Sequence, residues 1–436
     1  MSPIFIGIIG IFLFFLLMFS GMPIAYTMAI VGFVGFSIIN SIPAASRVLT
    51  VEIFATFSSY SLSVVPMFIL MGFLAFHSGM GSRLFSFAYK AIGHLPGGLA
   101  IATQATCAIF GAVCGSNTAT AATIGAIAIP EMRRYGYADS LSTASVAAGG
   151  AIGVLIPPSV IFIIYGIATE QSIGRLFLAG IIPGILLTLL YMITVYMLAS
   201  RNTDLAPRGE KASYYDTFHS LTGGVWEVLI IFIISLGGLF AGWFTPTEAG
   251  GVGAAGVLVL TLLSRHLRFV NLKSALLDTT RTTGMIMLLV AGAIIFGRFM
   301  SISRMPFELA AFVGDLPLPS FMVMAIILVV YLFLGFFIDA LALVLLTIPI
   351  FYPVVVQTLG YDPIWFGVII VLVAAMGVIT PPVGMNVYII KGVVPSVPLE
   401  VIFSGIWPFL FALIVCISIL LAFPGITTFL PNLVFN

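Results

Sequence analysis

Two interrupted apolar runs constrain the fold of this chain more than any other feature of its sequence. They read Gly-Val-Leu-Ile-Pro-Pro at 153–158 and Gly-Val-Ile-Thr-Pro-Pro at 377–382. A proline pair removes two backbone donors and clashes with the preceding turn, so no helix runs unbroken through either motif. The motifs are 224 residues apart, and Gly-Tyr pairs at 136–137 and 360–361 precede them at the same spacing. The spacing predicts two copies of one unit, at 1–215 and 216–436.

The runs around these breaks are too apolar for a soluble protein. The chain has 61% hydrophobic and 7% charged residues, whereas soluble domains carry about a quarter charged residues. A net charge of +1 gives no reason to expect a nucleic-acid partner. The composition predicts an all-α integral membrane protein in contact with the lipid bilayer. Segments able to cross about 30 Å of hydrocarbon lie near 3–20, 22–41, 64–80, 138–169, 174–199, 222–242, 246–264, 282–302, 362–391 and 398–424.

Two further apolar stretches are long enough for two helices each, but their middles carry glycine and polar residues. We predict re-entrant helical hairpins over 97–132 and 319–356, with tips at 115–118 and 335–339. Irregular backbone at membrane depth is tolerated only where it is buried in protein or lines a wet cavity, and paired interruptions in a transporter indicate the binding site. The alternative is a pair of kinked helices that bind nothing. The complete prediction adds broken helices at 138–169 and 362–391 and interfacial arm helices at 43–60 and 266–281.

The predicted topology can be compared with the placement of lysine and arginine. Each copy makes an odd number of net crossings, so the second copy enters from the opposite side, as in inverted-topology repeats. Twelve basic residues then fall on one side and three on the other. Because cytoplasmic loops carry an excess of lysine and arginine, we expect the richer side to be cytoplasmic and both termini to lie on the opposite side of the membrane.

The hairpin tips and the breaks offer oxygen ligands of the kind that Na⁺ accepts. They are hydroxyls, a carboxylate and the carbonyls of unwound backbone. We predict two pseudo-symmetric Na⁺ sites, one in each copy. The candidate ligands are Ser116, Asn117, Thr118, Gly150, Gly153 and Pro157 in the first copy, and Gly335, Asp339, Gly377 and Thr380 in the second. Residues 116–118 could instead only cap a helix, and Asp339 could be a solvated N-cap at the membrane surface.

An anionic substrate is expected between the two cation sites. The N-termini of half-helices would present backbone amides to its carboxylate. The candidate side chains are Arg298, Ser301, Ser116, Thr380 and Asn386. The planar fork of Arg298 suits a carboxylate, although this side chain could equally extend to the membrane interface. The sequence contains no HExxH, GxSxG or P-loop motif, so we expect neither an enzyme nor a cofactor other than Na⁺ as coupling ion.

Six strings in order give the chain a family resemblance. They are GMPIAY at 21–26, PMFILMGFLAFHSGM at 66–80, GSNTATAATIGAIAIPEM at 115–132, GVLIPPS at 153–159, FTPTEAG at 244–250 and GVITPPVGMNVY at 377–388. Together they resemble the large membrane subunit (the M, or DctM-like, subunit) of tripartite ATP-independent periplasmic (TRAP) transporters. The resemblance covers essentially the whole chain.

This resemblance implies a sodium-coupled importer of an organic acid, of the sialic acid or C4-dicarboxylate type, in the inner membrane of a bacterium. It also implies an architecture similar to elevator-type ion transporters, in which a mobile body carries the hairpins and the broken helices past a scaffold. The implied partners are a small four-helix membrane subunit and a soluble periplasmic substrate-binding protein. The competing hypotheses are a passive anion channel and a membrane scaffold that transports nothing.

Overall fold

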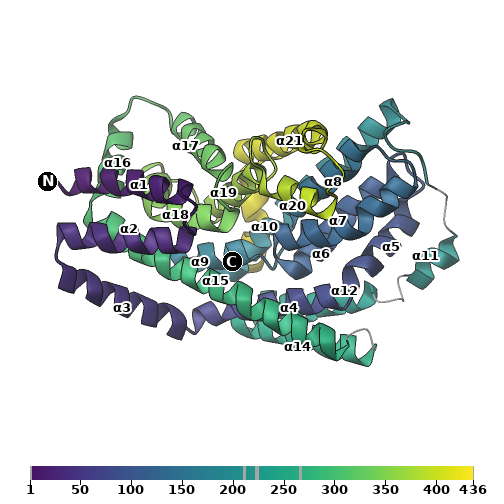
Figure 1. The fold of residues 1–436 in the computed structure, drawn as a ribbon, viewed down its shortest axis with the longest axis horizontal. Coiled ribbons are helices and arrows are strands. Elements are labelled where there is room, and N and C mark those ends of the chain that lie inside the picture. The colour runs from purple at the N-terminus through teal and green to yellow at the C-terminus, as the bar shows by residue number, and fades with distance from the viewer. Residues whose placement is uncertain (1, 210–212, 221–224, 265–267, 436) are drawn as a thin grey trace.

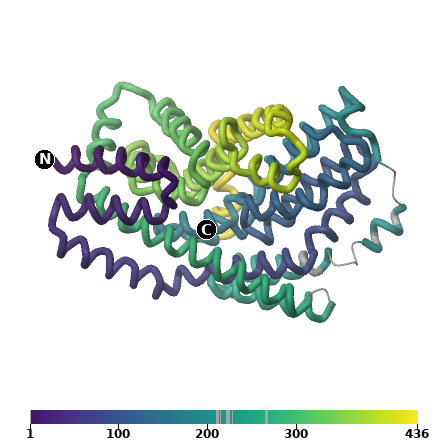
Figure 2. The backbone as a smooth tube through the Cα atoms, viewed as in Figure 1, coloured from purple at the N-terminus to yellow at the C-terminus, as the bar shows by residue number. Residues whose placement is uncertain are grey.

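The computed structural model describes residues 2–209, 213–220, 225–264 and 268–435 (Figure 1). Every regular element within these ranges is a helix, so the all-α prediction is confirmed for the part of the chain that the structure describes. The backbone trace shows an elongated molecule, with the N-terminal helices at one end (Figure 2).

The helices of the first half are separated by short connections. They are α1 (Pro3–Phe19), α2 (Ile24–Ile39), α3 (Ile42–Ser58), a 3-10 turn (Ser61–Ser63), α4 (Val64–His77), α5 (Met80–Ile92), α6 (Gly98–Cys114), α7 (Asn117–Arg134), α8 (Asp139–Ile152), α9 (Val160–Thr169) and α10 (Ile173–Arg201). α6 and α7 flank the predicted hairpin tip, and α8 and α9 flank the break at 153–158. Helix formation therefore stops where glycine or paired proline interrupts the apolar pattern.

The second half follows the same order after a short helix, α11 (Tyr214–Ser220). Its elements are α12 (Trp226–Phe232), a π-helical turn (Ile233–Gly237), α13 (Gly238–Phe240), α14 (Pro246–Leu263), α15 (Phe269–Ile302), α16 (Met305–Asp315), α17 (Ser320–Gly335), α18 (Ala340–Tyr352), a second π-helical turn (Pro353–Thr358), α19 (Pro363–Gly377), α20 (Met385–Val393), α21 (Leu399–Ala422) and α22 (Gly425–Phe435). α17 and α18 flank the second predicted tip, and α19 and α20 flank the break at 377–382.

The predicted arm at 266–281 is continuous with the next predicted crossing from Phe269 onward, and residues 266 and 267 lie outside the described residues. α15 is one helix of 34 residues, about 51 Å long at 1.5 Å per residue. No proline lies between 269 and 302, so no proline interrupts the backbone hydrogen bonds of α15. In the first half, by contrast, α3 and the helix after it are distinct and bend by 55°.

Helix length gives a lower number of membrane spans than the ten crossings expected. Among the described residues, five helices are long and apolar enough to cross a membrane, or six if the bent pair is one span. The other apolar helices, α1 and α2 among them, have 10–17 residues. A helix of 17 residues is about 25 Å long, which is shorter than the hydrocarbon layer of about 30 Å.

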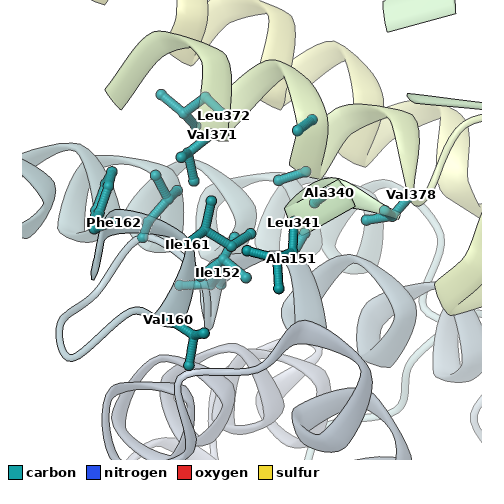
Figure 3. Packing of buried hydrophobic residues seen from close by; sticks show 14 of the residues in the cluster. Ala151, Ile152, Val160, Ile161, Phe162, Ala340, Leu341, Val371, Leu372 and Val378 are labelled. Carbon is teal, nitrogen blue, oxygen red and sulfur yellow. The ribbon is translucent and has the colours of Figure 1, made fainter. Parts of the chain in front are cut away.

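The two halves interlock through their broken helices. α9 packs against α18, and α20 packs against α7 and α8. The second segment of each broken helix thus contacts the helix pair of the other half. Figure 3 shows apolar side chains of both halves in this core, among them Ile152 and Ile161 from the first and Leu341 and Leu372 from the second. α15 packs against α2 and α4 and also contacts α18 of this core.

Two left-handed residues occupy equivalent places in the halves. Gly79, with a φ of 74°, joins α4 to α5, and Arg304, with a φ of 58°, joins α15 to α16. The serine before each residue is buried and donates its hydroxyl to the helix that ends there: Ser78 to Ala75 O at 2.8 Å, and Ser303 to Met300 O at 2.7 Å. Only glycine adopts this conformation without strain, so the joint at Arg304 is the more strained of the two.

Candidate substrate and cation site

A cavity of about 700 Å³ lies where the two helix-pair tips face α2, α4 and α15. Such a volume is typical of small-molecule sites. The lining is mostly apolar. It consists of Pro23, Ile24, Ala25, Ile69, Phe73, Cys114, Gly115, Ser116, Asn117, Thr118, Ala119, Ala122, Val154, Val160, Ile161, Thr282, Met285, Ile286, Leu289, Asp339, Leu341, Ala342, Met385 and Ile389. The cavity therefore contains residues of both tips, as the sequence predicts for a shared site.

Four helices begin at this cavity. Residues of the first turn of α7 (Asn117), α9 (Val160), α18 (Leu341) and α20 (Met385) all line it. The N-terminus of a helix has unpaired amides and a partial positive charge, which favour an anion. The lining residues include no lysine or arginine, and Asp339 is the one carboxylate among them. An anion in the cavity would therefore meet backbone amides instead of a basic side chain.

The first tip is fixed by hydrogen bonds within the turn. Ser116 is extended and caps α7, because its Oγ accepts a hydrogen bond from Ala119 N at 3.4 Å. Thr118 N donates to Asn117 Oδ1 at 2.9 Å, and the hydroxyls of Ser116 and Thr118 are 3.1 Å apart. Gly115 is left-handed, with a φ of 63°, and a Cβ there would lie 2.7 Å from Pro158 O. Glycine thus allows the tip to rest directly on the break.

The second tip is held by its acidic residue. Asp339 caps α18, because its Oδ2 accepts a hydrogen bond from Leu341 N at 3.0 Å. The same side chain is half-buried and lines the cavity. Capping and a place in the cavity were alternatives at this position, and Asp339 has both.

Glycine pairs join each helix pair to the break beside it. A Cβ on Gly111 would collide with Gly153, and a Cβ on Gly377 would lie 2.6 Å from the carbonyl carbon of Gly335. Both partners are 224 residues further on in the second half. The four glycines occupy equivalent positions and let the backbones touch at the places where helix hydrogen bonding ends.

Carbonyl and hydroxyl oxygens gather beside these contacts. In the first half, Gly150 O accepts a hydrogen bond from Gly153 N at 3.2 Å. Thr120 Oγ1 lies 3.0 Å from a Cβ position on Gly153. In the second half, Ala374 O lies 3.9 Å from a Cβ position on Gly335. Sequence reasoning missed Thr120 and Ala374. The available signals were the helical spacing of Thr120 from Ser116 and the spacing of 224 between residues 150 and 374.

Several predicted residues lie outside the cavity lining. Pro157 is buried in the first break. Thr380 in the second break donates its hydroxyl to Met376 O at 2.6 Å. Asn386 is fully buried and donates to Ala147 O at 3.0 Å. Ser301 is exposed.

Arg298 is not part of the cavity either. Its Nε donates to Glu52 Oε1 at 2.8 Å, and its side chain is 61% exposed. Leu289, the last lining residue of α15, precedes Arg298 by nine positions, which is two and a half turns of about 3.6 residues. Arg298 therefore lies on the opposite face of α15 from Leu289. Glu52 was not predicted, because its partner is 246 residues away in the sequence.

The chain matches one family of known proteins over nearly its whole length. Residues 11–426 match the family model "Tripartite ATP-independent periplasmic transporter, DctM component". The chain is 36% identical over 391 residues to the C4-dicarboxylate TRAP transporter large permease protein DctM of Pseudomonas aeruginosa, covering 89% of this chain and 90% of the relative. It is 34% identical to the sialic acid TRAP transporter large permease protein SiaM of Vibrio cholerae, with 96% of each chain covered.

A solved structure shares the fold. The YdaH transporter of Alcanivorax borkumensis superposes with a TM-score of 0.60 over 88% of this chain and 89% of that one, at 16% identity. That likeness concerns the fold alone. Taken with the family match over nearly the whole length, the helix pairs, the breaks and the cavity identify this chain as a large membrane permease of the TRAP transporter family.

Proposed function

We propose that this permease imports an organic acid together with Na⁺, by an elevator movement of the body that carries its helix pairs and broken helices. The observation that carries the proposal is the convergence of four helix N-termini and both tips on one cavity. Amides at those N-termini favour the anion, and the carbonyls and hydroxyls behind them suit a hard cation. Paired discontinuous helices of this kind hold substrate and coupling ions in other secondary transporters.

The anion would be held without a basic side chain. Asp339 already accepts a hydrogen bond from the first turn of α18, so the amides of that helix are partly satisfied. Gly384 precedes α20 and provides no side-chain cap, although Asn386 N donates to Val378 O at 2.9 Å and Val387 N donates to Gly384 O at 2.8 Å. The first residue of α20, Met385, lines the cavity, so its amide is the one that we propose for the anion. We expect the substrate carboxylate to lie nearest the N-terminus of α20.

The two cations would lie behind the cavity at the glycine contacts. The first site is formed around Gly150 and Gly153 by Ser116, Asn117, Thr118 and Thr120. The second is formed around Gly335 and Gly377 by Asp339, Ala374 and Thr380. Helix C-terminal carbonyls coordinate Na⁺ in comparable transporters. Sodium bound here would fix each tip against its break and prepare the cavity for the anion.

The two left-handed joints suit a movement between two bodies. α4 and α15 pack against each other and would belong to the scaffold. α5 packs on α6, and α16 packs on the π-helical turn after α18, so both would accompany the moving body. Gly79 is the left-handed residue between α4 and α5, and Arg304 is the left-handed residue between α15 and α16. Hinges are commonly a few positions at element ends.

The substrate belongs to the organic acids, and the cavity accommodates either a C4-dicarboxylate or sialic acid. Relatives of similar identity carry different substrates in their names, including isethionate at 36% identity in Oleidesulfovibrio alaskensis. Arg298 is paired with Glu52 on the far face of α15. Arg298 therefore gives no reason to prefer sialic acid over a C4-dicarboxylate.

The proposed orientation places the loop at 200–215 in the cytoplasm and both termini in the periplasm, across a bacterial inner membrane; residues 210–212 of this loop lie outside the described residues. A cysteine at Asp204 should react with a membrane-impermeant maleimide only after the cells are opened. A cysteine at Ser2 should react in intact spheroplasts. The native cysteines are all buried, which limits background labelling. Reaction of residue 204 from outside would invert the topology.

The function is tested by reconstitution with a small membrane subunit and a periplasmic binding protein, the partners that we propose. With an inward Na⁺ gradient, uptake of radiolabelled sialic acid or succinate should saturate with substrate. It should fall to background without the gradient or without the binding protein. Flux or conductance without a Na⁺ gradient would favour an anion channel, and the absence of any flux for organic acids would favour a scaffold.

A further inference from the structure

Asn386 connects the two halves of the molecule at the first break. It is the second residue of α20 in the second half, and its side chain is fully buried. Its Nδ2 donates to Ala147 O on α8 at 3.0 Å. This hydrogen bond fixes the orientation of the amide, because the opposite orientation would set Oδ1 against another carbonyl.

The other end of this amide has no protein partner. Asn386 Oδ1 is buried without a hydrogen bond among the described residues. Burying an unpaired amide oxygen is costly, and nearly all such atoms in folded proteins have a partner. An apolar side chain of similar volume would fill the same space without this cost, so the oxygen itself calls for an explanation.

The surroundings of Asn386 are the first cation site proposed above. A Cβ on Gly150 would lie 3.0 Å from Asn386 Nδ2 and 3.0 Å from Asn117 O. Thr120 Oγ1 flanks the next turn, at 3.0 Å from a Cβ position on Gly153. None of these groups is charged. Asn386 Oδ1 is bonded to the same carbon as Nδ2, so it lies in the same small region as Asn117 O and Thr120 Oγ1.

We propose that Asn386 Oδ1 is a Na⁺ ligand that the second half contributes to the cation site of the first. The inference rests on the proposed sodium coupling. An amide oxygen is a suitable ligand for a hard cation. The residue before it, Met385, lines the substrate cavity at the start of α20. Sodium at Asn386 would therefore hold α20 against α8 and set the position of the helix N-terminus that faces the substrate.

A buried water offers a different partner for the same atom. Asn117 Nδ2 is also buried without a partner, and one water could bridge it to Asn386 Oδ1. Under that hypothesis, loss of Oδ1 lowers stability equally at every sodium concentration. If Oδ1 is a sodium ligand, its loss raises the Na⁺ concentration at the midpoint of the sodium-dependent rise in unfolding temperature.

The test measures thermal unfolding of the purified full chain with its small subunit, without substrate, as Na⁺ replaces choline. Wild type should be stabilised as Na⁺ rises. In Asn386→Leu, the midpoint of this response should move to about tenfold higher Na⁺ or beyond. Asn386→Asp keeps an oxygen and adds a negative charge, so its midpoint should lie below that of wild type.

Gln104 provides a matched control. It is a buried amide that donates to Ser145 O on the same helix α8 at 2.8 Å, and its Oε1 also has no partner. Its Oε1 lies 3.1 Å from a Cβ position on Gly149, which is also 2.7 Å from Cys107 Sγ. Gln104→Leu should change the unfolding temperature by the same amount at all Na⁺ concentrations and leave the Na⁺ midpoint unchanged.

The outcomes separate this inference from the proposed function. A wild-type protein that Na⁺ does not stabilise would overturn both. A sodium response that is the same in wild type and Asn386→Leu would overturn the assignment of Asn386 and leave sodium coupling intact. If Asn386→Leu does not fold, the aspartate and serine variants decide: a midpoint for Asn386→Ser equal to that of wild type, with no decrease for Asn386→Asp, refutes the ligand.

Discussion

Gly377→Ala and Gly111→Ala should each destabilise the protein by about 1–3 kcal/mol or more, the usual cost of overpacking a close-packed core. The methyl group added at position 377 would lie 2.6 Å from the carbonyl carbon of Gly335 and 2.7 Å from its oxygen. The methyl group added at position 111 would collide with the backbone of Gly153. Backbone cannot rotate away as a side chain does, so each pair of helices must separate.

Two glycines elsewhere in helices serve as controls for this prediction. No atom lies within 4 Å of a Cβ position on Gly284 in α15 or Gly392 in α20. Alanine is favoured over glycine inside a helix by up to about 1 kcal/mol, so these variants should be as stable as wild type or slightly more stable. Unfolding temperatures in one detergent are the measurement. Equal losses for all four variants would mean that the glycine contacts are not tight.

Asn117→Ala and Asp339→Ala should each weaken or abolish the Na⁺ dependence of uptake while the protein remains folded and inserted. Each variant removes a side-chain oxygen from one of the two tips, beside the carbonyls freed at the paired prolines. If the sites are separate, each variant should also lower the Hill coefficient for Na⁺ toward one. The measurement is initial uptake against Na⁺ concentration at saturating substrate.

Both side chains also cap or brace a helix start, so loss of a cap needs its own control. Thr245 caps α14 in a capping box with Glu248, and it does not line the cavity. Thr245→Ala should cost about 0.5–2 kcal/mol of stability and leave the Na⁺ dependence unaltered. If both tip variants keep the wild-type sodium affinity and cooperativity, Asn117 and Asp339 only cap helices and do not bind Na⁺.

The interruptions of the helices could be predicted because their causes are local. Paired proline ends a helix wherever it occurs, and the described helices stop at Ile152 and Gly377, beside the two motifs. The arm at 266–281 could not be predicted in the same way. Its charged residues suggest an interfacial helix, but only the absence of a break indicates that it continues as α15.

The faces of the helices were harder to predict than their ends. Arg298 is recognisable as an intramembrane charge, but its partner Glu52 is distant in the sequence, and the pairing depends on how α3 packs against α15. Asn386 is similar. The repeat spacing indicates two related halves, but it does not reveal that α20 of one half packs on α7 and α8 of the other. Such contacts are set by tertiary packing and leave no periodic signal.

The proposed recognition of the substrate through helix N-termini has a consequence for how the selectivity of this permease could change. A point mutation can replace a basic side chain, but it cannot delete a backbone amide. The amides at the start of α7, α9 and α20 would therefore keep attracting an anion while the apolar lining, such as Phe73 or Met285, varies around them. Mutations of the apolar lining could then change which acid fits the cavity while every intermediate variant still binds an anion. No basic side chain would have to be moved or replaced.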